Sequence, residues 1–499
     1  MNKLLKMNKL LLFSIVTLLL FSTKKINAQE VIKLTFQEVI KLSEEQSPNA
    51  LMAKHTYRAS YWNYRTFVAQ YRPSLTLTGT TPDYSTAYDK VWNSQFERWD
   101  YKATNIISNY SSLVLSQNIG FTGGSISLSS DLTLYNDIEN NSHRFISSPI
   151  NIGLTQPLFR YNALKWQKKI EPLRYQAAKK TFITSIESVH QQAVSFFFSL
   201  ALAQINKQIA DINYSNADTL WRISKGRYEL GTIAEDELLQ MQLSWLNAET
   251  SRKEAEINLR DREIRMRSFL GFNENVRLEL TLPTEIPSLQ VSIQEVFDLA
   301  MTNNPEILTQ QLKLLAAQSN VAQAKAESGF NANLIASFGL RDQDPNFRLA
   351  YSDPNQQQRI RIGFSFPILD WGLGRGKYKM AKSSLELAQV QSQQAIADFQ
   401  QNLFLDVEKF NLQAAQVGIA AKSDTVAQKM FEVTKQRFLI GKISVLELNN
   451  ADSKKDQNKR AYVQSLQNYW NFFYNLRSLT LYDFVNKRPL ETDYDNLIK

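Results

Sequence analysis

Cysteine is absent from the 499 residues, and glycine (16) and proline (13) are scarce. Without a thiol the chain forms no disulfide, binds no metal through a thiolate and offers no site for lipid attachment to a cysteine. Low glycine and proline content favours long helices over many short elements joined by turns. If this protein contacts a membrane, its own polypeptide must make the contact.

Catalytic motifs are also missing. The three histidines, His55, His143 and His190, are scattered, and no metal-ligand spacing is present. The segment GLGRG at 372–376 lacks the spacing and the acidic partner of a nucleotide-binding loop, so a plain strand-to-helix turn is favoured. We therefore expect no catalytic residue, no cofactor and no metal, and an enzyme is the least favoured class.

An excess of basic residues is nearly absent as well. The formal charge is +9, but five lysines lie within the first 28 residues, which leaves nine minus five, or +4. The remaining basic residues are interleaved with acidic ones and form no patch. This balance argues against nucleic acid as a partner.

The one long apolar run lies at the N-terminus. Residues 1–9 are basic, 10–21 are apolar, and a polar segment follows up to Ala28. This layout predicts a secretory signal peptide at 1–28, because the apolar run falls short of the roughly 20 residues that a membrane-spanning helix needs. A retained anchor is the alternative. Beyond it no stretch could span a bilayer as a helix, so any insertion must use β-strands.

The rest of the chain is a tandem duplication. The segment LTFQEV at 34–39 returns as VSIQEV at 291–296, an offset of 257 residues. Later matches, such as Gly231 with Gly441, have an offset of 210, so the first copy holds 47 extra residues. We place the first repeat at 29–285, the second at 286–485 and a C-terminal tail at 486–499. The excess, a polar stretch near 80–148, is interpreted as an extended loop or an additional hairpin.

Each repeat has the same internal order: a helix, two alternating segments, and a very long helix that turns back at a glycine. The alternating segments, at 74–78, 150–155, 332–338 and 360–366, predict strands with one apolar face. The helical tracts, 163–228 and 377–438, have lengths typical of a coiled coil or bundle. Their turns, at 228–237 and 438–447, are expected to be the tips of antiparallel helical hairpins.

This order resembles the TolC-like outer-membrane efflux proteins. The matching phrases are the two opening helices, LTFQEVIKLSEEQSPNA and VSIQEVFDLAMTNNPEI, and the two tips, RYELGTIAEDELLQ and RFLIGKISVLELNN. The strand-to-helix phrases PLFRYNALKWQ and PILDWGLGRGKY match as well. The resemblance implies a mainly α protein that forms a homotrimer, in which long helical hairpins build a trimeric α-barrel tunnel.

The resemblance also implies a shared twelve-stranded transmembrane β-barrel, with four strands from each subunit. Its apolar strand positions would contact outer-membrane lipid. The opposite positions would line the lumen and are Thr76, Asn151, Thr155, Asn333, Arg361 and Ser365. Sheets packed on a soluble core are the alternative.

Functional residues are expected at the tips. By resemblance, the pore-gate candidates are Glu447, Asn450, Phe438 and Ile443, although Asn450 is neutral where the family has a second carboxylate. Three Glu447 carboxylates near one axis would repel one another and select cations; an ordinary carboxylate in a helix's first turn is the equally weighted alternative. Candidates for adaptor docking are Gly231, Gly441, Glu235, Asp236 and Glu237, with a purely structural cap as the alternative for the glycines.

The implied function is export across the outer membrane, with the protein extending into the periplasm. Its implied partners are a periplasmic adaptor protein and an inner-membrane pump, in a tripartite efflux or type I secretion system. The alternative is a periplasmic adaptor or coiled-coil scaffold, which has one hairpin rather than two. The aromatic run at 469–474 predicts helix packing in preference to a substrate-contact surface.

Overall fold

The computed structural model describes residues 30–272, 276–283, 285–440 and 442–498. The expected signal peptide and Gly441 therefore lie outside the described residues. The chain divides into two compact units, and each repeat contributes to both of them. Unit one comprises residues up to 54, 183–300 and 403–492; unit two comprises 55–182, 301–402 and 493 onward.

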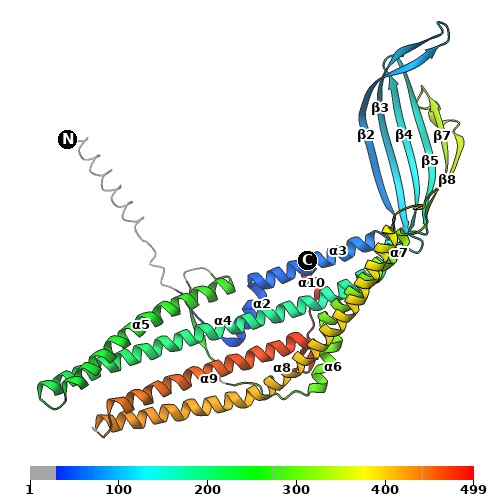
Figure 1. The fold of residues 1–499 in the computed structure, drawn as a ribbon. Coiled ribbons are helices and arrows are strands. Elements are labelled where there is room, and N and C mark those ends of the chain that lie inside the picture. Colours follow the sequence, from blue (N-terminus) through cyan, green and yellow to red (C-terminus); the bar gives the residue numbers. More distant parts are fainter. Residues whose placement is uncertain (1–29, 273–275, 284, 441, 499) are drawn as a thin grey trace, which may run out of the picture. The chain divides into compact units, whose positions relative to one another are not determined.

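The helices repeat the order expected from the duplication (Figure 1). In the first repeat they are α2 (Phe36–Gln46), α3 (Pro48–Ala69), α4 (Ala163–Glu229) and α5 (Glu235–Leu270). In the second they are α6 (Ile293–Asn303), α7 (Pro305–Glu327), α8 (Leu373–Leu439) and α9 (Val445–Thr480). The helices α4 and α8 both have 67 residues, and α5 and α9 both have 36. At 1.5 Å per residue each long helix extends about 100 Å.

Local sequence explains where these helices begin. Thr35 caps α2: its hydroxyl accepts from the Glu38 amide at 3.4 Å, and the Glu38 carboxylate accepts from the Thr35 amide at 2.8 Å. Asn304 caps α7 ahead of Pro305, which suits the first helical position because it has no amide hydrogen to satisfy. None of the helices in the described ranges has the length and hydropathy of a membrane span.

Unit two contains one antiparallel sheet of six strands within the described ranges, in the order β2-β3-β4-β5-β7-β8 (Figure 1). The strands are β2 (Ser74–Asn93), β3 (Arg98–Ile119), β4 (Gly124–Asp137), β5 (Ser142–Leu158), β7 (Asn331–Asp344) and β8 (Asn355–Ser365). The expected four strands per chain are therefore wrong for this protein. The polar excess of the first repeat supplies the difference, because it folds as paired strands rather than as a loop.

The register carries one apolar surface across all six strands. Leu115 lies opposite Leu75 and Leu128, and Ile152 lies opposite Leu128 and Phe338. We call this surface the apolar sheet face; it consists of Leu75, Leu77, Leu113, Leu115, Ile126, Leu128, Ile152, Leu154, Ala336, Phe338, Ile360, Ile362 and Phe364. Most of these side chains are exposed, so the sheet is not one layer of a soluble core.

Unit one contains a short parallel pair that the sequence pattern did not predict. Strand β1 (Glu30–Thr35) pairs with β6 (Val276–Thr281), which follows the first hairpin. Smaller elements complete the chain: η1 (Leu349–Tyr351), β9 (Tyr482–Asp483), β10 (Arg488–Pro489) and α10 (Tyr494–Ile498).

An aromatic cluster forms the core of unit one. The Phe36 ring packs on Phe197 and Trp470, with ring centroids 5.2 and 4.6 Å apart. Tyr469 and Phe473 are buried beside Trp470. The aromatic run of α9 therefore packs in the core, as its sequence predicted, and is not a surface for substrate. Burying rings of this size is the main stabilising contribution available to such a helix bundle.

Candidate functional site

The tip of the first hairpin lies between α4 and α5. The amide of Thr232 donates to the Arg227 carbonyl at 2.9 Å, and Gly231 has φ +70°. A glycine in this left-handed conformation satisfies the last carbonyls of the helix and ends it, because other residues pay a steric cost there. Helix α4 ends at Glu229, and the chain turns at Gly231 before α5 begins at Glu235.

The second tip repeats this hydrogen bond. The Lys442 amide donates to the Arg437 carbonyl at 3.0 Å, the same five-residue link as in the first tip. The Ser444 hydroxyl then caps α9 by accepting from the Glu447 amide at 3.3 Å. Glu447 consequently lies in the first turn of α9, where the helix dipole favours a negative charge.

The four gate candidates do not share one environment. Glu447 and Asn450 are exposed, whereas Ile443 is half-buried. Phe438 packs against the buried cluster of Phe431, Leu448 and Ala451. The structure thus separates Phe438, which holds α8 to α9, from the two exposed polar residues. Their part in a gate stays a prediction.

The docking candidates of the first tip are all accessible. Glu235, Asp236 and Glu237 form the acidic first turn of α5 and are exposed, as is Gly231. A Cβ added at Gly231 would meet no atom within 4 Å. The tip therefore presents backbone and acidic side chains to any partner, and adaptor docking stays a prediction.

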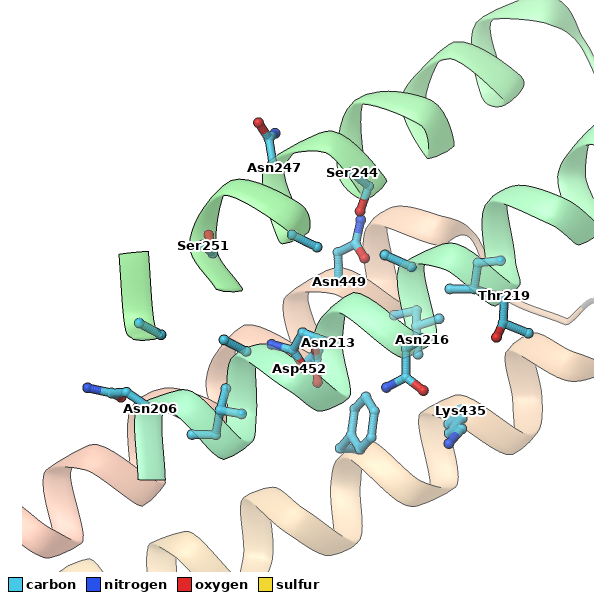
Figure 2. A pocket seen from close by; sticks show the side chains of 18 of the residues that line it. Asn206, Asn213, Asn216, Thr219, Ser244, Asn247, Ser251, Lys435, Asn449 and Asp452 are labelled. Atoms are coloured by element: carbon cyan, nitrogen blue, oxygen red, sulfur yellow. The ribbon is translucent and has the colours of Figure 1, made fainter. Parts of the chain in front are cut away.

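Behind the tips, the two hairpins enclose a groove of about 710 Å³ with both polar and apolar side chains in its lining, formed by α4, α5, α8 and α9 (Figure 2). Asparagines from three of these helices line it, among them Asn206, Asn213 and Asn449. The Asn213 amide nitrogen donates to an Asp456 carboxylate oxygen at 2.9 Å, and Arg460 donates to the Asn206 amide oxygen at 2.8 Å. Here α4 and α9 are therefore joined by hydrogen bonds between polar side chains.

A carboxylate that the sequence analysis missed also lines this groove. Asp452 lies 2.5 Å from the Lys455 ammonium and is partly buried. Burial raises the pKa of Asp452 above its ordinary value, and Lys455 only partly offsets this. Its spacing from Leu448 and Asp456 on one face of α9 was a signal available in the sequence, but the pairing of Asp456 with Asn213 on α4 needed the fold.

A buried ion cluster lies elsewhere in unit one. Arg477 of α9 donates to both carboxylate oxygens of Glu187 on α4, at 3.0 and 2.9 Å. The ring nitrogens of His190 lie 3.4 Å from a Glu44 oxygen and 3.5 Å from a Glu187 oxygen. These charges tie α2, α4 and α9 together. The described residues include no group of three or more histidines and acidic residues placed to hold a metal ion.

The lumen candidates lie on the polar face of the sheet. In the register Thr155 lies opposite Ile335, and Ile335 lies opposite Arg361. Likewise Asn333 lies opposite Gly363, and Ser365 opposite Asn331. Thr76 and Asn151 alternate with members of the apolar sheet face on their own strands. The register therefore groups all six candidates on one side, and their contact with a lumen stays a prediction.

Comparisons with known proteins agree with this architecture. The family model described as outer membrane efflux protein matches residues 39–272 and 296–480, which span both repeats. An uncharacterized protein of Haemophilus influenzae is 22% identical over 362 residues, covering 67% of this chain and 76% of that protein.

Among solved structures, the CmeC outer membrane channel of Campylobacter jejuni matches with a TM-score of 0.65 at 14% identity, covering 93% of this chain and 88% of its own. The outer-membrane channel OprN matches with a TM-score of 0.62 at 14% identity, covering 89% of each chain. Both likenesses concern the fold. The family match includes two hairpins, whereas the adaptor alternative would have one. The chain belongs to the outer membrane efflux protein family, and is a channel protein of the outer membrane rather than an enzyme.

Proposed function

We propose that this chain is one subunit of a homotrimeric export channel, the outer-membrane part of a tripartite efflux pump or a type I secretion system. The apolar sheet face is the observation that carries the proposal. Thirteen residues in register, most of them exposed, form a surface that lipid would cover. Small molecules or proteins would leave through the lumen beside the opposite face.

Aromatic residues at one end of the sheet support this membrane placement. Phe121 follows β3, Phe159 follows β5, Phe330 precedes β7 and Phe366 follows β8, and all four are exposed. The register brings these strand ends together, since Leu158 lies opposite Ala332 and Ser365 opposite Asn331. Rings of this kind gather at the boundary between lipid and water in outer-membrane proteins.

The hairpin tips would have two roles in export, docking of the adaptor and control of the inner end of the channel. A periplasmic adaptor, itself bound to an inner-membrane pump, would dock on the exposed tip around Gly231 and its acidic turn, Glu235–Glu237, and on the matching tip at Gly441. In the trimer three copies of Glu447 would meet near one axis at the narrow inner end, where the carboxylates would repel one another and select cations. Asn450, one turn further along α9, would line the same constriction without charge.

Single-channel conductance in planar bilayers tests this proposal. We expect a small, cation-selective conductance for the purified protein, and a larger, less selective one for Glu447→Ala. The matched control is Glu237→Ala, at the equivalent position of the first tip, which should leave conductance unchanged. A protein that conducts in neither form would overturn the channel, and equal effects of the two substitutions would overturn the gate at Glu447.

A further inference from the structure

The outer strands of the six-stranded sheet are unprotected edges. Among the described residues, β2 pairs only with β3, and β8 only with β7. Edge strands of soluble proteins commonly carry proline, lysine or a bulge that blocks further pairing. The segment SLTLTGT at 74–80 of β2 has none of these, and β8 has neither proline nor lysine. The rest of β2 carries Pro82, a bulge between Thr80 and Asp83, and Lys90, so the open part of that edge is 74–80. Both edges are therefore open to another strand.

Exposure of the apolar sheet face rises toward these edges. Leu77 of β2 is 73% exposed and Ile360 of β8 is 77% exposed, whereas Leu128 and Ile152 on inner strands are 42% and 44% exposed. Inner residues have a neighbour on each side, and edge residues have one on a single side. A strand paired with either edge would give the apolar residues of that edge a neighbour on both sides, as the residues of the inner strands already have.

A sheet with open edges is unstable in lipid, because each unpaired backbone group there costs several kcal/mol. The six strands of one chain are too few to close on themselves, since the smallest membrane barrels have about eight. Successive strands alternate in direction, so β8 runs opposite to β2. The β8 edge of one copy can therefore join the β2 edge of the next as a regular antiparallel pair.

We infer that three copies of this chain close a barrel of eighteen strands, three times six, in which β8 of each subunit pairs with β2 of its neighbour. The inference rests on the proposed function for the number of copies. It departs from the twelve strands that the resemblance implies. Barrel diameter grows roughly in proportion to strand number, so this barrel is about one and a half times as wide and leaves an aqueous channel. The extra strands of the first repeat thus set the width of the exit.

Cysteine cross-linking tests the edge pairing, and the absence of native cysteine leaves no background. Thr76→Cys on the polar face of β2 would be combined in turn with Arg361→Cys, Gly363→Cys or Ser365→Cys on β8. These three positions step along β8 on the same face, so they sample the unknown register between subunits. Mild oxidation of the protein in detergent or lipid, followed by denaturing electrophoresis, then shows which copies are joined.

We expect one of the three pairs to give a ladder of cross-linked chains that ends at the trimer. A ladder ending at the dimer would mean twelve strands from two copies and would overturn the inference. The competing four-strand arrangement, with β4 as the edge, predicts cross-links from Ser127→Cys on β4 to the same β8 positions; such cross-links would also overturn it. Thr76→Cys with Val114→Cys is the positive control, because these residues lie opposite each other within one chain.

Conductance of the same preparations separates this inference from the proposed function. If the protein conducts but forms no cross-link between β2 and β8, the proposed channel function stands and the eighteen-stranded barrel is overturned. If the protein neither conducts nor forms cross-links between subunits, although the control pair within one chain does form, both the proposed function and the eighteen-stranded barrel are overturned.

Discussion

At the scale of single residues, the buried cluster around His190 makes the stability of unit one depend on pH. Burial favours the neutral ring, but the carboxylates of Glu187 and Glu44 outweigh it and raise the pKa of His190. Burial would raise the pKa of Glu187, but His190 and Arg477 outweigh it and lower the pKa. Asp483 and Tyr474 complete the charged and titratable surroundings. Folding therefore favours the charged forms of His190, Glu187 and Asp483, whereas burial raises the pKa of Tyr474 and favours its neutral form.

This arrangement predicts a pH window of maximum stability. The raised pKa of His190 gives stabilisation that is complete below its unfolded pKa of about 6.5 and is lost as pH rises through the folded value. The lowered pKa values of Glu44 and Glu187 give stabilisation that is present above about 4.3 and is lost as pH falls through their folded values. We therefore expect the thermal unfolding midpoint to decline on both sides of this window.

The His190→Gln variant should lose the alkaline part of this decline and keep the acid part. Circular dichroism melts of the detergent-solubilised protein across a pH series would measure both slopes. His55→Gln is the matched control, since His55 is exposed and should leave the profile unchanged. An unchanged alkaline slope in His190→Gln would show that another group causes it.

At the scale of elements, glycine suits the hairpin tip, where the backbone is left-handed, but destabilises the interior of the helix that leads into it. Gly231 has φ +70°, and Gly226, five residues earlier, lies inside α4; a Cβ at either position meets no atom within 4 Å. Sterics against neighbours are therefore equal at the two positions, and only the backbone conformation differs.

We expect Gly231→Ala to destabilise the tip by about 1 kcal/mol, because alanine is strained in the left-handed region. Gly226→Ala should instead stabilise by about 1 kcal/mol, because alanine loses less backbone entropy in a helix. Hydrogen exchange of the amides at the end of α4 would measure both changes. Effects of the same sign at the two positions would contradict the assignment of Gly231 as the residue that ends the helix.

At the scale of the whole molecule, the two faces of the sheet must meet different surroundings. Ile152 and Thr155 lie on β5, the first on the apolar sheet face and the second on the polar face. We expect Ile152→Arg to impair membrane assembly, because a charge facing lipid costs about 2–4 kcal/mol near the midplane. Thr155→Arg should assemble normally.

Recovery of the folded protein in an outer-membrane fraction, or its insertion into vesicles, would measure this difference. Equal recovery of the two arginine variants would contradict lipid contact at the apolar sheet face. Failure of both would point to packing within β5, and a leucine substitution at Ile152 then tests whether charge or shape is responsible.

The sequence by itself determined the order of elements and most of their bounds. The duplicated phrases and the scarcity of glycine and proline in the long tracts, where only Pro172, Gly226 and Gly418 occur, predicted α4 and α8 within a few residues, because helix formation over such lengths depends on local composition. Glycine at 231 marked the tip for the same local reason. The alternation at 150–155 and 360–366 predicted the two faces of the strands, since side chains on a strand alternate whatever it pairs with.

Only the tertiary structure decided which segments pair. The polar stretch at 80–148 alternates weakly, so its sequence was compatible with a loop or with an additional hairpin, and the register with Leu75 and Ile152 was needed to show that it forms two further strands. The pairing of β1 with β6, and the contacts of Asp456 with Asn213 and of Glu187 with Arg477, join residues about 245 to 290 positions apart. Local propensity has no information on contacts at such separations, because they exist only once the chain has folded.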